Sequence, residues 1–210
     1  MPHPTVFTPE DIWHGGYFEL SVELGHRSDE RLRTALDTLW KHQSLNGCYM
    51  RRDVEPENQK RVALSDFNFD DGWGGHCLGI ATLPNDKRIA CGTCVIRETD
   101  GPDWLDLYLP MGAIGTAYDI GGFPFLLADD PPAAWINDLE PWLAGIATSV
   151  ADVVPYRMAI IGFEVSGQYY ASDLSRDGIP DTRYIGYIWP DNGTYNYFNT
   201  NADVRDKPNV

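Results

Sequence analysis

The chain has 210 residues, of which 43% are hydrophobic and 12% aromatic, and its formal net charge is −15. The hydrophobic content excludes a disordered acidic tail, and the negative charge disfavours binding to nucleic acid or to an anionic membrane, because their phosphates would be repelled. A chain of this length can bury one substantial core, so we expect a single domain over residues 1–210.

The first half of the chain predicts a strand, a helix and a hairpin. Apolar and polar residues alternate over residues 17–24, which indicates a half-buried strand with one apolar and one acidic face. Ser28 can cap a helix, and apolar residues at helical spacing predict that helix over residues 28–45. Residues 77–83 and 88–98 are two further strands, and the turn-forming residues between them indicate a hairpin.

The second half repeats this order of elements. A strand over residues 104–111 precedes a segment with several glycines and prolines over 115–132 and a helix over 133–153. Pro141 should kink or split that helix, because proline cannot donate the helical backbone hydrogen bond. Three more strands are predicted over residues 156–165, 183–189 and 194–198.

The order of these elements favours two β-α-β-β units, over residues 17–98 and 104–189. Two such units can form one antiparallel β-sheet with two main helices packed on one face, which is an α+β fold. No flexible linker lies near residue 100, so both units belong to one domain. Residues 199–210 are expected to form a mobile tail.

The strongest functional signal is a one-signed stretch, residues 98–156, in which every charged residue is acidic. Between Glu98 and Tyr156 the chain has no Lys, Arg or His. A surface of this sign favours a cationic partner, because it attracts positive charge and speeds encounter. Acidic residues in loops are the ones that a partner can reach. The predicted partner-binding acids are Asp100, Asp103, Asp119, Asp129 and Asp130.

Three aromatic residues in glycine-rich loops extend this prediction. Trp73, Tyr118 and Phe123 lie in such loops rather than in the amphipathic helices. Aromatic side chains there either anchor the loop or contact a partner, because aromatic residues are enriched at binding hot spots. We therefore include them among the candidate partner-binding residues.

The cysteines and histidines give a weaker signal for a metal. Cys91 and Cys94 form a C-x-x-C pattern, but they lie in a predicted strand, where residues three apart point to opposite faces. A zinc site with His76 and Cys77 would need a turn at Gly92. Buried structural thiols are the favoured interpretation, and we expect neither a metal nor a cofactor.

Sequence motifs predict neither catalysis nor secretion. The chain has no phosphate-binding loop, no nucleophile elbow and no dinucleotide-binding fingerprint, so we expect it not to be an enzyme. Its N-terminus lacks the charged and apolar regions of a signal peptide, and nowhere are about 18 consecutive residues apolar. We expect a cytoplasmic protein.

One segment of the chain resembles a known family. The run Trp13-His-Gly-Gly-Tyr-Phe-Glu-Leu-Ser-Val22, followed by the helix that ends at Leu39-Trp40, resembles the N-terminal part of bacterial immunity proteins of polymorphic-toxin and type VI secretion systems. The resemblance covers about the first 45 residues. It implies an α+β antitoxin that binds its cognate toxin, for example a basic nuclease, and has no enzymatic activity.

Two alternatives stay open. Paired β-α-β-β units also resemble drug-binding regulatory domains, which hold cationic aromatic ligands beside a buried carboxylate, and Glu164 is the candidate carboxylate in an otherwise apolar strand. This is an analogy at the level of the fold. The last alternative is a metal-dependent enzyme whose acids and histidines come from different elements, although no acid and base are paired by spacing.

Overall fold

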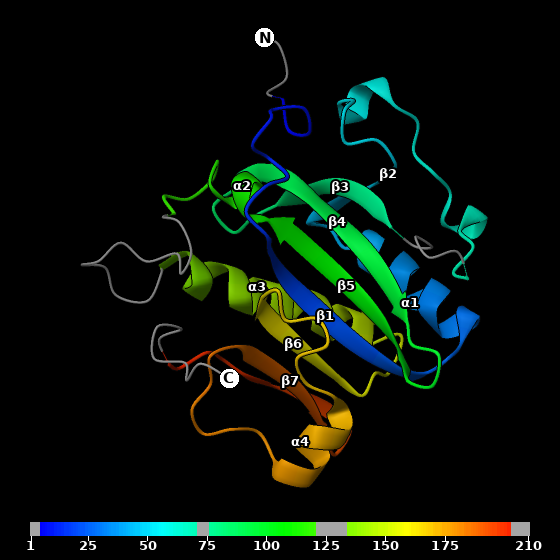
Figure 1. The fold of residues 1–210 in the computed structure, drawn as a ribbon, viewed down its shortest axis with the longest axis vertical. Coiled ribbons are helices and arrows are strands. Elements are labelled where there is room, and N and C mark those ends of the chain that lie inside the picture. Colours follow the sequence, from blue (N-terminus) through cyan, green and yellow to red (C-terminus); the bar gives the residue numbers. More distant parts are fainter. Residues whose placement is uncertain (1–4, 71–75, 121–133, 203–210) are drawn as a thin grey trace.

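The computed structural model describes residues 5–70, 76–120 and 134–202. These residues form a mixed α/β fold with one eight-stranded sheet and four α-helices (Figure 1). The strand order is β2-β3-β4-β5-β1-β6-β7-β8, and every neighbouring pair is antiparallel. The antiparallel sheet of the predicted fold is therefore confirmed.

The described residues form eight strands, four α-helices and two short 3-10 helices. The strands are β1 (Tyr17–His26), β2 (Leu45–Tyr49), β3 (Cys77–Thr82), β4 (Arg88–Arg97), β5 (Pro102–Pro110), β6 (Met158–Phe163), β7 (Gly186–Asp191) and β8 (Thr194–Phe198). The helices are α1 (Asp29–Trp40), α2 (Met111–Ile114), α3 (Ala134–Ala151) and α4 (Ala171–Asp177), with two short 3-10 helices, η1 (Pro56–Asn58) and η2 (Leu64–Asp66).

The arrangement as two separate β-α-β-β units is not confirmed. Strand β5 would begin the second unit, but it pairs with β4 on one side and with β1 on the other, and both of these belong to the first. The sheet also contains β2, which the sequence did not predict, and α4 intervenes between β6 and β7. The two halves of the chain therefore interleave at the centre of the sheet.

Helices α1 and α3 cover one face of the sheet. Helix α1 begins as expected, with the Ser28 hydroxyl accepting a hydrogen bond from the Arg31 backbone N–H. Its apolar stripe is buried in one core with the apolar residues of α3 and of the central strands. Helix α3 runs through Pro141 as one element and is not split. The carboxylate of Glu140 is buried and accepts hydrogen bonds from the Tyr197 hydroxyl and the Thr200 backbone N–H, both at 2.8 Å.

The opposite face of the sheet is covered in part by α4. A second core joins Leu174 of α4 to Trp104 of β5 and to Ile160 of β6. Strand β1 is consequently buried on both faces, and the expectation of a half-buried strand with an exposed acidic face is wrong. Its acidic side chains lie between the sheet and the segment that leads into α4.

The end of the described chain is held by hydrogen bonds. The backbone N–H groups of Asn201 and Ala202 both donate to the Arg183 carbonyl oxygen. The first residues of the predicted tail therefore pack beside the segment that precedes β7. The rest of that tail, residues 203–210, lies outside the described residues.

Candidate functional site

The structure places some of the predicted partner-binding residues at the surface. Asp100 and Asp119 are exposed, Asp100 in the turn between β4 and β5 and Asp119 after α2. Tyr118 is half-buried, and burial is the main reason that the pKa of its hydroxyl rises to about 12. Four further predicted residues lie outside the described part of the chain: Trp73, Phe123, Asp129 and Asp130.

Asp103 lies in a strand, whereas the sequence predicted that it lies in a loop. Strand β5 begins at Pro102, so Asp103 is a strand residue and is 2% exposed. Its carboxylate accepts hydrogen bonds from the Arg97 guanidinium at 2.9 and 3.1 Å and from the Ser28 backbone N–H at 2.8 Å. Asp103 therefore joins the β4–β5 hairpin to the start of α1, and a partner cannot reach its side chain.

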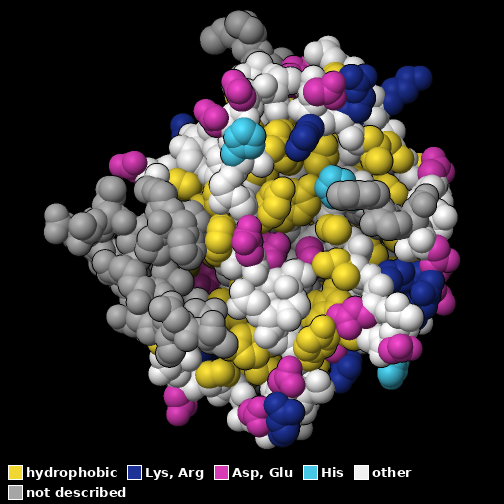
Figure 2. Space-filling view, viewed as in Figure 1, with side chains coloured by type: hydrophobic (Ala, Val, Ile, Leu, Met, Phe, Trp, Pro, Cys, Tyr) yellow, Lys and Arg dark blue, Asp and Glu magenta, His cyan; other side chains and the backbone are white. Residues whose placement is uncertain are grey.

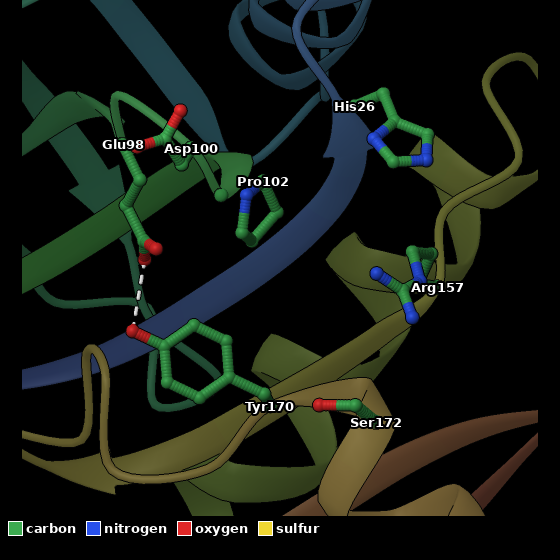
Figure 3. A pocket seen from close by; sticks show the side chains of 8 residues that line it. His26, Glu98, Asp100, Pro102, Arg157, Tyr170 and Ser172 are labelled. Carbon is green, nitrogen blue, oxygen red and sulfur yellow. Dashed lines mark hydrogen bonds between the residues drawn. The ribbon is translucent and has the colours of Figure 1, made fainter.

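A cavity of about 310 Å³ lies beside Asp100. Four parts of the chain form it: the end of β1, the β4–β5 turn, the residue before β6 and the start of α4 (Figure 3). The lining residues are His26, Glu98, Asp100, Gly101, Pro102, Arg157, Tyr170 and Ser172. One of the two loops that the sequence selected for its acids thus borders the cavity.

Glu98 is fixed on the wall of this cavity. Its Oε1 accepts hydrogen bonds from the Trp104 indole N–H and the Tyr170 hydroxyl, both at 3.0 Å. The bond to Glu98 is also the main reason that the pKa of Tyr170 is raised. Gly101 allows the carboxylate to lie here, since a Cβ at that position would be 2.0 Å from Glu98 Oε2.

Arg157 is held on the same cavity by a buried acid. Its Nη1 lies 2.9 Å from Oε1 of Glu23, whose side chain is fully buried. The other oxygen of Glu23 accepts a hydrogen bond from the Ala171 backbone N–H at 2.6 Å. Burial raises the pKa of Glu23, while the Ala171 N–H and the Arg157 charge act in the opposite direction. Sequence reasoning missed this pair because it assigned Glu23 to a solvated face.

A pair of buried acids lies further along the same face of the sheet. Glu19 of β1 and Asp106 of β5 are diagonal neighbours, because Ser21 is opposite Asp106 and Glu19 is opposite Tyr108. Burial, the main cause for both, raises the pKa of Glu19 to about 7 and that of Asp106 to about 6. The Ser166 backbone N–H donates to Glu19 at 2.8 Å, and the Ser21 hydroxyl donates to Asp106.

Aromatic side chains border this acid pair. Tyr17 and Tyr108 meet edge to face at 4.8 Å, and the His76 ring stacks on Tyr108, with 2.7 Å between His76 Nε2 and the Tyr108 hydroxyl oxygen. Tyr17 remains 37% exposed. Figure 2 shows acidic side chains near the centre of this view, among hydrophobic and uncharged ones. The arrangement can hold a positive charge beside aromatic rings.

The cysteines do not gather around a metal position in the described residues. Cys48, Cys77, Cys91 and Cys94 are all free thiols. Over residues 5–70, 76–120 and 134–202, no three His, Cys, Asp or Glu side chains lie close enough together to hold a metal ion. Burial raises the pKa of the Cys94 thiol to about 11, helped by the charges of Asp106 and Glu19, so this thiol resists ionisation.

Comparison with known proteins gives no relative. No protein-family model, no curated protein and no solved structure matches the chain. Within the residues that the structure describes, no helix combines the length and the apolar character that are needed to cross a bilayer. Functional inference therefore rests on the cavity beside the β4–β5 turn and on the buried acid pair.

Proposed function

We propose that the protein is a non-enzymatic acidic binding protein, an immunity protein or antitoxin that neutralises a cognate basic toxin by direct binding in the bacterial cytoplasm. The observation that carries this proposal is the exposed carboxylate of Asp100 in the β4–β5 turn, within the one-signed stretch of the sequence. A cationic toxin side chain that docks against the outer side of this turn would meet this carboxylate.

The distribution of positive charge supports the same proposal. The 31 acidic residues outnumber the 16 Lys and Arg residues, and six of those cations in the described part of the chain are paired with carboxylates of the chain itself, so they repel a cationic partner less than unpaired cations would. Arg27, Lys41, Arg51, Arg97, Arg157 and Arg176 all form such ion pairs. Two more guanidinium groups, those of Arg31 and Arg33, donate to backbone carbonyls.

Charge reversal at Asp100 tests this proposal. Asp100→Lys should weaken binding of the cognate toxin about tenfold, because the reversal repels the toxin during encounter and in the complex. Titration calorimetry at low and at physiological salt measures the change, which should shrink as salt screens the charges. Asp181→Lys is the matched control, since Asp181 is exposed and lies outside the one-signed stretch of the sequence. Equal affinities for the two variants would exclude this docking surface.

The buried acid pair favours a second candidate function, binding of a cationic aromatic ligand. The carboxylate expected for this role, Glu164, is exposed and follows the end of β6, so it is not the buried acid that such a ligand needs. Glu19 and Asp106 meet that requirement instead, because both are buried and lie beside Tyr17 and Tyr108. A cation placed there would compensate the charge that burial disfavours.

Thermal unfolding with a simple probe tests this second candidate. Benzyltrimethylammonium at millimolar concentration should raise the melting temperature of the wild-type protein by a few degrees near pH 8, where both acids ionise more readily. The shift should vanish in Glu19→Gln and persist in Glu164→Gln, which removes an exposed carboxylate nearby. A shift that depends on Glu164 and not on Glu19 would contradict the assignment.

A further inference from the structure

The cavity beside the β4–β5 turn has walls of opposite charge. The carboxylates of Glu98 and Asp100 come from the turn, whereas Arg157 immediately precedes β6 and His26 ends β1. Figure 3 shows the two sets on opposite sides, with Pro102 between them and the Tyr170 ring below Glu98, to which its hydroxyl is hydrogen-bonded. A cavity for a basic toxin side chain has no need of a guanidinium group on its second wall, so Arg157 calls for a separate explanation.

The two walls do not neutralise each other. Among the ion pairs of the described residues, Arg157 is joined to Glu23 and not to Glu98 or Asp100. Each charge is fixed by partners of its own: Glu98 by hydrogen bonds from Trp104 and Tyr170, and Arg157 by its ion pair with Glu23. These supports keep the opposite charges apart with the cavity between them, and such preorganisation lowers the entropy cost of binding.

Both walls keep hydrogen-bonding capacity for a ligand. The contacts that the structure gives Glu98 within the described residues use Oε1, which leaves Oε2 available to a donor. The guanidinium group of Arg157 has five N–H donors, and Glu23 is its carboxylate partner in the described part of the chain. The side chain of Arg157 is 47% exposed, so a molecule in the cavity can reach it.

We propose that this cavity binds a small zwitterion of the α-amino-acid class, with its ammonium group on Glu98 and Asp100 and its carboxylate on Arg157. A simple amine meets the positive wall, and a simple carboxylate meets the negative wall, so each is repelled by one side. A zwitterion satisfies both walls. The volume of about 310 Å³ lies at the small end of ligand pockets, which fits a molecule of this size. The inference does not rest on toxin neutralisation.

Three probes of one shape test the proposal on the full chain. L-phenylalanine carries both charges, phenethylamine lacks the carboxylate, and 3-phenylpropionate lacks the ammonium group. Titration calorimetry should give L-phenylalanine an affinity at least about tenfold above that of either analogue, because only the zwitterion pairs with both walls. No measurable binding of L-phenylalanine at about 10 mM, or equal binding of all three probes, would overturn the proposal.

Substitutions on the two walls should change the affinities for the amine and for the carboxylate probe in opposite directions. Arg157→Gln should weaken the binding of L-phenylalanine about tenfold and strengthen the binding of phenethylamine, because it removes the positive charge that repels the amine. Asp100→Asn should weaken the binding of L-phenylalanine and strengthen the binding of 3-phenylpropionate. Because Asp100 lies in an exposed turn, this variant should fold even if Arg157→Gln does not. Asp181→Asn is the control and should change none of the three. A uniform change for all probes would show that the walls do not select the ligand and would overturn the assignment.

Discussion

Replacing Arg97 with methionine is expected to lower the free energy of unfolding by about 3–5 kcal/mol, the typical cost of removing one partner of a buried ion pair. The Arg97 side chain is 7% exposed and holds the nearly fully buried carboxylate of Asp103 through two hydrogen bonds. It also reaches Asp29 at the start of α1 and Asp70. Without the guanidinium group, the charge of Asp103 stays buried with only the Ser28 N–H as a described donor. Urea unfolding followed by circular dichroism measures the loss.

Arg51→Met is the matched control for this prediction. Arg51 makes an equally close ion pair with Asp53, but both side chains are more than half exposed. Water solvates both charges there, so the loss should be much smaller than that of Arg97→Met. The double variant Arg97→Met with Asp103→Leu should lose less than the sum of the two single variants, since no unpaired buried charge is left. Equal losses of unfolding free energy for Arg97→Met and Arg51→Met would show that burial of the Arg97–Asp103 pair does not affect stability.

The alternation in β1 predicted a strand correctly but could not predict what covers its second face. A period of two residues reports which side chains share a face, and it does not report what packs on that face. Glu19 and Glu23 are buried by the Ser166 and Ala171 region, about 150 residues later in the chain. Such contacts depend on the fold as a whole, which is why the acids were assigned to a solvated surface.

Local residue types explain the errors at strand ends. Gly101-Pro102 resembles a turn, but proline is acceptable at the first position of a strand, so β5 starts there and includes Asp103. Asn46-Gly47 resembles the end of a helix, yet it lies in β2. Gly47 is small for a packing reason, since a Cβ there would lie 2.4 Å from Cζ3 of Trp40.

The candidate cavity was predictable only on one side. The cluster of acids drew attention to the β4–β5 turn, and Asp100 is exposed there, as a partner contact requires. The opposite wall depends on Arg157 and Tyr170, which the antiparallel pairing of β6 with β1 and the position of α4 bring to the turn. Charge along the sequence therefore indicated an acidic surface, while the fold forms a site of mixed charge.

The acid pair on the sheet makes a second strong prediction, a loss of stability as the pH rises. The pKa of Glu19 is raised from 4.5 to about 7 in the folded protein, mainly by burial and then by the charge of Asp106. Below the ordinary pKa both folded and unfolded chains bind the proton, so the stabilisation is fully present. As the pH rises towards about 7, the unfolded chain releases this proton first and stability falls.

Glu19→Gln should remove this dependence. The stability of the wild type minus that of Glu19→Gln should fall by about 3 kcal/mol between about pH 4 and pH 8, since one pKa unit corresponds to about 1.4 kcal/mol. Asp106→Asn should move the fall to lower pH, because the Asp106 charge helps to raise the pKa of Glu19, as does that of Glu164. Urea unfolding across this pH range measures both effects, with Glu10→Gln as the control that removes an exposed carboxylate. A difference that stays constant with pH would mean that Glu19 is solvated in the folded protein, and the second face of β1 would then be open to water.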